Sequence, residues 1–512
     1  MSKVRVRFAP SPTGPLHMGG VRTALYNYLF AKKNGGDFIL RIEDTDEKRF
    51  VPGAQDYIVE SLKWCGIEPN EGAGYGGDKG PYVQSDRMDL YRPYADQLVA
   101  SGHAYLAFDT SEDLENMREQ AKTMGLANWQ YNGVTRSSMK NSISLSKEEV
   151  EKRLASGDPY TIRMKMPRNV DVKLEDEIRG WVSVNTNNLD DKVLFKETGM
   201  PTYHLANIVD DHLMEVTHVI RGEEWLPSAP LHVLLYDSFG WERPKFAHLP
   251  LILRPDGKGK LSKRDGDKLG FPVFPIDWIT ADGEMYSGYK EDGYFKDAFM
   301  NMLALLGWNP GDNQEIFSLD ELVNLFSLER VGKSGARFDP DKTKWFNQQY
   351  LRATSNQGLA EMIIADSIVK GDYSTDYLAN VCGLMKERAT FIKDIVSDGS
   401  YFFSTEVTEY DEKTVLKKWK EGTPEIMQEL ISELNTISDF TTENIETVFS
   451  AYLAKKEYGF GKVGPGLRLL ITGKGMGPSM FEICATLGKS LVLSRMKEGL
   501  AKVNALKAAA QQ

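Results

Sequence analysis

Over the first 65 residues, short apolar segments typical of strands alternate with segments whose apolar residues have helical spacing. Residues 4–8 (VRVRF) predict a strand, and apolar side chains at helical spacing then predict a helix from about Gly19 to Lys33. A second apolar strand follows over residues 38–42, and another helix over residues 53–65. The order strand, helix, strand predicts two parallel strands joined by a right-handed crossover.

Similar patterns recur as far as residue 253. Helices are predicted over residues 86–101, 147–155 and 228–239, and strands over residues 104–108, 160–166, 181–184, 202–209, 216–221 and 246–253. The character of the chain changes after residue 108, and a polar stretch rich in Ser and Asn follows over residues 128–144. We therefore interpret residues 109–200 as an inserted α/β domain. The glycine-rich residues 72–80 predict a loop.

Helical spacing dominates beyond about Gly270. Apolar stripes predict helices over residues 299–306, 376–396, 424–437 and 443–454, and core packing explains each stripe. The predicted fold class is α/β, with a parallel-sheet domain, an inserted α/β domain and a mainly α-helical C-terminal half. The predicted domain boundaries divide the chain into residues 1–108, 109–200, 201–256, 257–338 and 339–512.

Composition narrows the class of protein. The chain has 512 residues and a net charge of −11, so nucleic-acid contacts must come from local basic patches. Three distant cysteines, Cys65, Cys382 and Cys484, argue against a disulfide framework. The N-terminus enters a charged strand directly, and no run of 18 apolar residues occurs. These features predict a soluble cytoplasmic protein without a membrane span.

The loop between the first strand and helix, residues 9–20 (APSPTGPLHMGG), is the first candidate site. Glycines at a helix N-terminus allow phosphate to approach backbone N–H groups and a partial positive charge. A plain turn explains such glycines equally well. Ligands of parallel sheets bind beyond the C-terminal strand ends. Arg7, His17 and Glu43 are therefore expected to gather at that edge.

A second stretch, residues 260–264 (KLSKR), favours the phosphate interpretation. It lies on a loop whose glycines, Gly257, Gly259 and Gly266, permit movement. Attack on the α-phosphate of ATP requires alignment and charge stabilisation more than acid–base catalysis. A neutral His17 can donate to phosphate oxygens, and loop lysines can stabilise departing pyrophosphate. The pair of stretches predicts a nucleotidyl-transfer site.

Residues 10–20 resemble the first signature of class I aminoacyl-tRNA synthetases, and residues 260–264 resemble the second. Other segments resemble bacterial-type glutamyl-tRNA synthetases, in the family's order: residues 7–14 (RFAPSPTG), 41–46 (RIEDTD), 203–207 (YHLAN), 219–225 (VIRGEEW), 333–336 (KSGA) and 345–347 (WFN). The resemblance covers the first two-thirds of the chain. It implies a Rossmann-like catalytic domain with an insert that binds the tRNA acceptor end, a stem-contact domain and a helical anticodon-binding region.

The resemblance also implies the residues of a glutamate pocket. These are Arg7, Ala9, Ser11, Glu43, Tyr203, Asn207 and Arg221. A guanidinium suits the side-chain carboxylate of the substrate, and Glu43 suits its α-ammonium group. Without the motifs, a surface salt bridge would explain either arginine better.

The implied ATP site contains His17, Gly19, Gly20, Glu224, Trp225 and Lys263. The implied catalytic residues are His17, Lys260 and Lys263, and Mg²⁺ is expected to accompany ATP. Packing remains an alternative for Trp225, and a carboxylate near a helix start remains one for Glu224.

Related families differ at specific positions. Glutaminyl-tRNA synthetases typically carry Asp-Asp-Thr-Asn where this chain has Glu43-Asp44-Thr45-Asp46, and glutamyl-queuosine enzymes lack the C-terminal half. Many bacterial relatives have a Cys-x-Cys zinc site where this chain has residues 105–109 (YLAFD). We therefore predict no zinc, and we expect no metal at Asp210-Asp211-His212.

The function that the resemblance implies is ATP-dependent activation of L-glutamate to glutamyl-adenylate, with release of pyrophosphate, followed by transfer to the 3′ end of tRNA(Glu). The expected partners are L-glutamate, ATP and tRNA(Glu), and a monomer is expected. Two alternatives stay open: a non-catalytic tRNA-binding paralogue and another adenylyl-transferring protein of the same fold. The pattern names no anticodon-reading residue and leaves open whether tRNA(Gln) is also glutamylated and whether activation requires tRNA.

Overall fold

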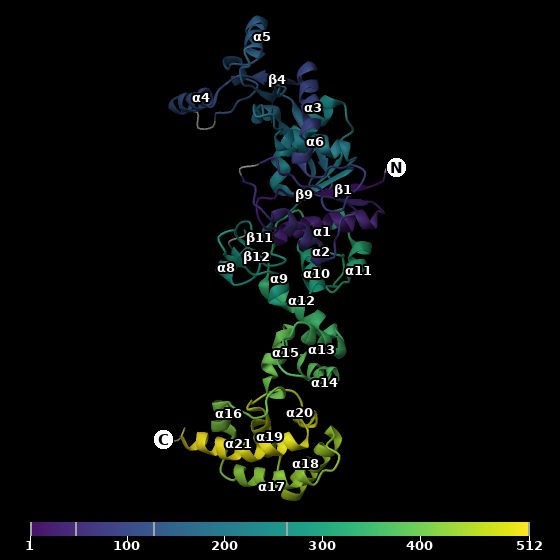
Figure 1. Cartoon of the computed structure of the whole chain (residues 1–512), viewed down its shortest axis with the longest axis vertical. Coiled ribbons are helices and arrows are strands. Elements are labelled where there is room, and N and C mark those ends of the chain that lie inside the picture. Colours follow the sequence, from purple (N-terminus) through teal and green to yellow (C-terminus); the bar gives the residue numbers. More distant parts are fainter. Residues whose placement is uncertain (1–2, 47–48, 126–128, 263–264, 510–512) are drawn as a thin grey trace. The chain divides into compact units, whose positions relative to one another are not determined.

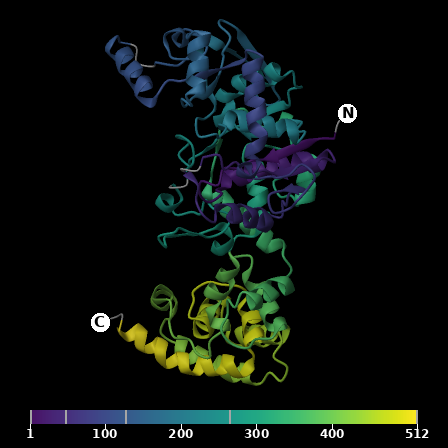
Figure 2. The same cartoon turned by 45° about the horizontal axis from the view of Figure 1, so that its top comes forward.

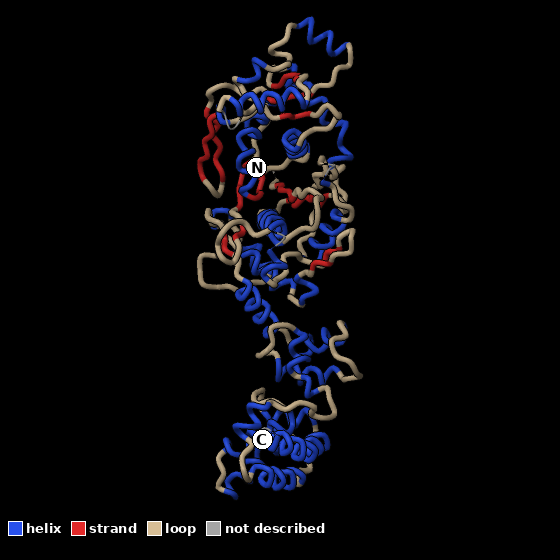
Figure 3. Tube along the Cα trace, turned by 90° about the vertical axis from the view of Figure 1, so that its left-hand side faces the viewer, coloured by secondary structure: helices blue, strands red, loops and turns tan. Residues whose placement is uncertain are grey.

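The computed structural model describes residues 3–46, 49–125, 129–262 and 265–509. Figure 1 shows the course of the chain and labels many of its helices and strands. The chain divides into two compact units, Met1–Thr343 and Lys344–Gln512. The first unit mixes strands and helices, whereas the described part of the second contains helices and loops only, blue and tan in Figure 3. The predicted fold class is confirmed, and the finer domain boundaries stay predictions.

The first unit begins with the predicted strand, helix, strand succession. Strand β1 (Arg5–Phe8) and strand β2 (Asp37–Leu40) pair in parallel, and helix α1 (Met18–Lys33) connects them. The turn before β2 passes so close to the first strand that a Cβ on Gly36 would lie 2.3 Å from the Val4 carbonyl oxygen. Only glycine fits there. The helix itself ends before Gly35, whose φ of +60° is the left-handed conformation typical of a helix C-terminus. The predicted stripe on α1 is fully buried at Val21, Ala24, Leu25 and Leu29 and half-buried at Tyr28.

A second sheet continues beside the first. Its strand order is β7–β6–β10–β9, with β6 (Asp171–Asp176), β7 (Gly180–Asn185), β9 (His218–Gly222) and β10 (Lys245–Leu249). Strand β10 runs parallel to both β9 and β6. A hydrogen bond from Thr217 N to Arg5 O, 2.9 Å long, links the edge of this sheet to β1. The region predicted as an insert therefore supplies two strands to the main sheet.

The rest of residues 54–200 contributes to two sheets: β3 pairs in parallel with β2 of the first sheet, and β4, β5 and β8 form an antiparallel sheet of order β4–β5–β8. The elements are α2 (Ala54–Cys65), β3 (Glu71–Gly72), α3 (Met88–Ala100), β4 (Ala104–Ala107), α4 (Ser111–Thr123), α5 (Lys147–Ala155), β5 (Thr161–Met164) and β8 (Val193–Phe195). Strands β3, β6 and β8 and helix α4 were not predicted, and Gly72 of β3 falls in the predicted loop over residues 72–80. Helix α4 has a mostly polar sequence, so its apolar stripe is weak, but a capping box at Thr110 and Asp113 marks its start.

The strand predicted over residues 202–209 is wrong. These residues belong to helix α6 (Tyr203–Leu213). Seven consecutive residues from Leu205 to Asp211 are buried, including the polar Asn207, Asp210 and Asp211, so the helix has no solvent-exposed face over this stretch. A short apolar run of this kind does not separate a buried strand from a buried helix, and periodicity therefore misled the prediction.

The single strand predicted over residues 246–253 is also wrong in extent. It divides into β10 and β11 (Ile252–Leu253), with Pro250 between them. Proline lacks the N–H group that a continuous strand pairing needs. Strand β11 pairs instead with β14 (Ala336–Arg337), which comes from the far end of the first unit.

The remaining elements of the first unit are mainly short. They are α7 (Ala229–Phe239), α8 (Asp265–Leu269), β12 (Trp278–Ile279), β13 (Met285–Tyr286), α9 (Tyr289–Asp292), α10 (Lys296–Leu305) and α11 (Leu319–Leu325). Helix α12 (Pro340–Ala353) begins at the end of this unit. Helices α7 and α10 lie close to the ranges predicted for them.

The second unit is helical, and its longest helix, α21, is the yellow helix of Figure 2. Its helices are α13 (Asn356–Ala365), α14 (Thr375–Met385), α15 (Ile392–Asp398), α16 (Glu412–Lys418), α17 (Thr423–Asn435), α18 (Thr442–Lys456), α19 (Phe460–Thr472), α20 (Met480–Leu487) and α21 (Lys489–Ala509). The single helix predicted over residues 376–396 is wrong, because it breaks between α14 and α15. The Asp394 carboxylate accepts from the N–H groups of Thr390 and Phe391, at 2.9 and 2.8 Å, and so starts a new helix.

Candidate active site

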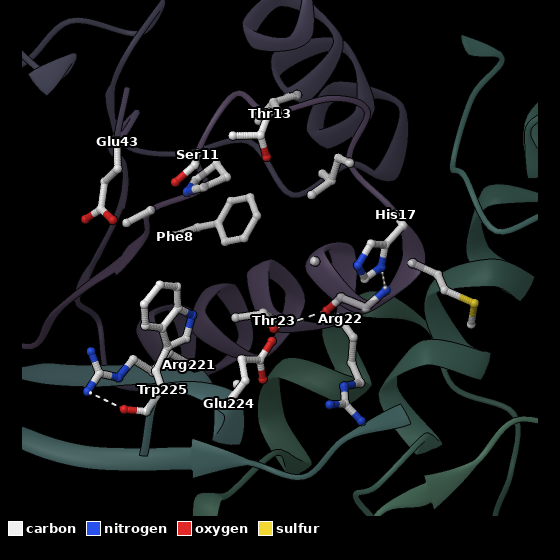
Figure 4. Close-up of a pocket in the computed structure, with 18 of the residues that line it drawn as sticks. Phe8, Ser11, Thr13, His17, Arg22, Thr23, Glu43, Arg221, Glu224 and Trp225 are labelled. Atoms are coloured by element: carbon white, nitrogen blue, oxygen red, sulfur yellow. Dashed lines mark hydrogen bonds between the residues drawn. The ribbon is translucent and has the colours of Figure 1, made fainter. Parts of the chain in front are cut away.

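A pocket of about 400 Å³ opens at the C-terminal ends of β1, β2 and β9 in the first unit. All the predicted site residues that the structure describes line it: Arg7, Ala9, Ser11, His17, Gly19, Gly20, Glu43, Tyr203, Asn207, Arg221, Glu224, Trp225 and Lys260. Lys263 lies outside the described residues. Figure 4 shows Glu43 and Arg221 towards one side of the pocket and His17 towards the other. After the substrates that the resemblance implies for these residues, we call the side of Glu43 and Arg221 the amino-acid end and the side of His17 the nucleotide end.

His17 caps helix α1 at the nucleotide end. Its Nδ1 accepts a hydrogen bond from the backbone N–H of Gly19 at 2.9 Å. In a neutral imidazole the proton then sits on Nε2, which becomes a donor. A Cβ on Gly19 would lie only 2.6 Å from His17 Cε1, so glycine is needed for this ring position. The arrangement presents a neutral donor beside the positive end of a helix, which suits phosphate oxygens.

Lys260 and Glu224 form an ion pair across the same end, with Nζ 2.9 Å from Oε1. The side chains are 48% and 44% exposed, so the pair is weakly held. Burial by itself would raise the pKa of Glu224, but the hydrogen bond and charge of Lys260, a backbone N–H and the nearby His17 together outweigh burial and lower it. The Glu224 carboxylate is therefore charged at neutral pH. Lys260 and Glu224 thus place a cation and an anion in the same part of the pocket wall.

The amino-acid end contains a charge-balanced cluster. Arg7 donates twice to Asp211, at 3.1 Å each, and Asp211 also accepts from Arg41 at 2.7 Å. Arg41 donates to Glu43 at 2.8 Å, and Asn207 donates to Glu43 Oε1 at 3.0 Å. Burial would raise the pKa of Asp211, but the two guanidinium groups outweigh burial and lower it. Two arginines and two carboxylates thus fix the positions of Arg7 and Glu43 in the pocket wall.

Arg221 is held differently, although it is only 5% exposed. The described partners of its guanidinium are neutral acceptors: Tyr203 Oη at 3.0 Å, His248 Nε2 at 3.1 Å, His232 Nδ1 at 3.3 Å and the Trp225 carbonyl at 3.4 Å. None of the described carboxylates forms an ion pair with it. A buried cation without a counter-charge favours binding of an anion.

Tyr203 and Trp225 complete the wall beside Arg221. Their rings pack with centroids 4.4 Å apart. Burial raises the pKa of Tyr203, so its hydroxyl stays protonated. Because its oxygen accepts from Arg221, its hydrogen is available to an acceptor in the pocket. Trp225 remains 39% exposed, so packing does not account for its whole surface.

Several supporting residues escaped the sequence analysis. Arg41 and Asp211 lie in segments that the sequence analysis named, residues 41–46 and 210–212, but neither was expected to position a pocket residue. His232 and His248 carry no motif that marks them as partners of Arg221. Only His248 left a signal, since it interrupts the otherwise apolar β10. Arg22, buried in α1, donates to the carbonyls of Pro250 and Leu306 and so ties the helix to later segments.

The Asp210-Asp211-His212 segment is engaged in protein contacts. Asp210 accepts from Arg87 at 2.7 Å and from the Tyr91 hydroxyl at 3.0 Å. The His212 ring stacks on Trp241 with centroids 3.8 Å apart. Among the described residues, no group of three His, Cys, Asp or Glu side chains could hold a metal ion. The absence of zinc stays a prediction.

Two known families match the chain. Residues 3–345 match the class I tRNA synthetase catalytic domain of the glutamate and glutamine enzymes, and residues 350–500 match an anticodon binding domain. Glutamate–tRNA ligases from Christiangramia forsetii and Flavobacterium psychrophilum are 54% and 56% identical to this chain. The alignments cover 98% of this chain in both cases, and 99% and 100% of those proteins.

A solved structure is similar over the same length. The crystal structure of a glutamate tRNA ligase from Elizabethkingia meningosepticum, in complex with its amino acid, matches with a TM-score of 0.94 at 52% identity. The match covers 98% of this chain and 100% of that one. Within the part of the chain that the structure describes, no helix is long and apolar enough to cross a membrane. The chain belongs to the glutamate–tRNA ligases, a family of class I aminoacyl-tRNA synthetases.

Proposed function

We propose that this chain ligates L-glutamate to tRNA(Glu) with ATP as co-substrate. An oxygen of the glutamate α-carboxylate attacks the α-phosphorus of ATP, the bond to the bridging oxygen breaks, and pyrophosphate leaves. A hydroxyl of the terminal tRNA ribose then attacks the carbonyl carbon of glutamyl-adenylate, loses its proton, and displaces AMP. The observation that carries the proposal is the buried, carboxylate-free Arg221 in the same pocket as the His17 helix cap.

The amino-acid end suits glutamate. Arg221 and the Tyr203 hydroxyl offer donors to a side-chain carboxylate, and Arg7 lies in the same wall. Glu43, fixed by Arg41 and Asn207, offers a carboxylate to the α-ammonium group. Ala9 and Ser11 line the pocket along the loop that joins the two ends. One loop would therefore hold both substrates with their reacting atoms close together.

The nucleotide end suits a triphosphate. His17, Gly19 and Gly20 provide a donor side chain and a helix N-terminus. Glu224 lines the wall between them and Trp225, whose ring lies beside Arg221 (Figure 4) and would contact the part of ATP that extends in that direction. Lys260 and Lys263 would stabilise the negative charge on the departing pyrophosphate. Mg²⁺ bound to ATP would neutralise part of that charge. A non-catalytic tRNA-binding paralogue would not need this set of groups.

We also propose that the second unit reads the tRNA anticodon and that the chain acts as a monomer in the cytoplasm. The match of residues 350–500 to an anticodon binding domain supports the first statement. The three cysteines are buried free thiols, which is compatible with a reducing compartment.

Pyrophosphate exchange tests the function directly. The full chain is incubated with ATP, labelled pyrophosphate and glutamate, glutamine or aspartate, with and without tRNA(Glu). We expect exchange with glutamate and only trace exchange with the other two amino acids. No exchange with glutamate in the presence of tRNA(Glu) would contradict the proposal, and equal exchange with glutamine would contradict the assigned specificity.

A further inference from the structure

His248 connects Arg221 to a carboxylate that does not touch the pocket. An arginine can only donate, so His248 Nε2, 3.1 Å from Arg221 Nε, must be the acceptor. The proton of a neutral His248 then lies on Nδ1, which is 2.6 Å from Asp176 Oδ2. Burial, with Arg221 nearby, lowers the pKa of His248 despite the contact with Asp176. The imidazole therefore stays neutral at neutral pH.

Asp176 is itself fixed by the turn of the β6–β7 hairpin. Its Oδ1 accepts from the N–H groups of Ile178 and Arg179, at 3.0 and 2.8 Å. Its Oδ2 also accepts from the backbone N–H of His248 at 3.1 Å. Asp176 lies opposite Phe246 where β6 pairs with β10. The carboxylate sets the tautomer of His248 while remaining one imidazole ring away from Arg221.

His232 holds the other side of the guanidinium by the same logic. Its Nδ1 lies 3.3 Å from Arg221 Nη1 and must accept, so its proton lies on Nε2. His232 Nε2 lies 3.2 Å from His204 Nδ1 and can donate a hydrogen bond to it. Burial, and after it the positive charge of Arg221, lowers the pKa of His232 well below its ordinary value. Both imidazoles thus act as neutral acceptors with defined tautomers.

Arg7 shows the alternative way of fixing an arginine in this pocket. It is bound by the Asp211 carboxylate, which compensates its charge. We propose that His248, set by Asp176, and His232 are positioning residues that fix Arg221 without neutralising it, so that the pocket requires an anionic amino-acid side chain. This inference rests on the proposed function and names what in the fold would separate glutamate from glutamine.

The physical basis is the difference between a carboxylate and an amide of the same shape. A buried guanidinium held by neutral acceptors gains a counter-charge when glutamate binds, whereas the neutral amide of glutamine leaves the charge uncompensated. The amide also brings an NH₂ group towards Arg221 and the Tyr203 hydroxyl, which are donors. A carboxylate in place of either imidazole would remove this preference, because Arg221 would already be paired.

Substitutions at His248 test the proposal through pyrophosphate exchange, with KM and kcat measured for glutamate, glutamine and ATP. His248→Leu should raise KM for glutamate about 10- to 100-fold, as is typical when a supporting partner is removed. The KM for ATP should change less than about twofold, because the nucleotide end is untouched. His248→Gln, which can still accept from Arg221, should recover most of the loss.

His248→Glu is the decisive variant. The new carboxylate would pair with Arg221, so the ratio of kcat/KM for glutamate over glutamine should fall at least about tenfold. A purely structural role for His248 would lower the ratio no more than His248→Gln does. The matched control is His218→Gln in β9, whose ring packs on Phe30 away from the pocket and should leave every parameter unchanged.

Asp176→Asn keeps the test decisive if a His248 variant does not fold, as judged by circular dichroism and thermal melting. An amide that donates to His248 Nδ1 would reverse the tautomer and set two donors, Arg221 Nε and His248 Nε2, against each other. We expect a raised KM for glutamate with an unchanged KM for ATP. Unchanged KM for glutamate in both Asp176→Asn and His248→Leu would overturn the inference. An inactive wild-type chain would instead refute the proposed function.

Discussion

The two ends of the pocket are built from different kinds of contact. At the amino-acid end, Arg7, Glu43 and Arg221 are at most 5% exposed and have positions fixed by several hydrogen bonds. At the nucleotide end, Lys260 and Glu224 are nearly half-exposed partners in one ion pair. Recognition of a small charged side chain calls for rigid, desolvated groups, whereas a triphosphate that enters and a pyrophosphate that leaves call for groups that can move.

The largest effect is expected from Arg221→Leu at the rigid end. Removing one partner of a buried charge contact costs about 2–5 kcal/mol, so kcat/KM for glutamate should fall by about 30- to 4,000-fold. The KM for ATP should stay nearly constant. Arg243→Leu, an exposed arginine paired with Asp237, is the matched control and should be neutral. An unchanged KM for glutamate in Arg221→Leu would contradict the view that the buried, fixed groups of the amino-acid end recognise the substrate side chain.

Lys263→Ala should give the next largest effect. Losing one group that stabilises transition-state charge typically costs about 100- to 1,000-fold in rate. Single-turnover adenylate formation should slow by that amount, while tRNA affinity changes little. Lys258→Ala, which removes another lysine from the same loop, is the control and should leave the rate of adenylate formation nearly unchanged. Equal losses in adenylate formation and tRNA binding would indicate a structural role for Lys263.

Acid should lower the free energy of unfolding through His204, a histidine that supports the amino-acid end. Burial, followed by repulsion from Lys192, lowers the pKa of His204 from 6.5 to about 4. Between these values the unfolded chain binds a proton that the folded chain does not, so the free energy of unfolding decreases as pH falls from 6.5 towards 4. The slope is at most about 1.4 kcal/mol per pH unit for one histidine. Thermal melts between pH 7.5 and 5 should show a flatter decline in His204→Asn, and an identical decline would refute this origin.

The smallest effect is expected from Glu224→Gln at the mobile end. A half-exposed ion pair contributes less than about 1 kcal/mol, so KM for ATP should change less than about fivefold and the melting temperature should not move. Steady-state kinetics with varied ATP checks this. A change of 100-fold would mean that the nucleotide end is as tightly organised as the amino-acid end.

Sequence reasoning worked where the information was local. The succession from β1 through α1 to β2 follows from apolar spacing and from Gly36, which alone fits beside Val4. It failed at α6, where burial on all sides erased the helical period, and at Pro250, where one missing N–H divided a strand. The candidate pocket residues came from motifs that lie at strand ends and loops, where fold logic brings them together.

The sequence by itself determined which groups line the pocket, because these residues lie in signature segments and at the C-terminal ends of predicted strands. Only the tertiary structure decided how each group is used. Arg7 meets a carboxylate and Arg221 meets imidazoles, although nothing near either arginine in the chain distinguishes them. Asp176 reaches Arg221 through His248, 72 residues away, because β6 pairs with β10. Long-range packing decides which charged group contacts which partner. It therefore also decides that the charge of Arg221 remains available to a substrate.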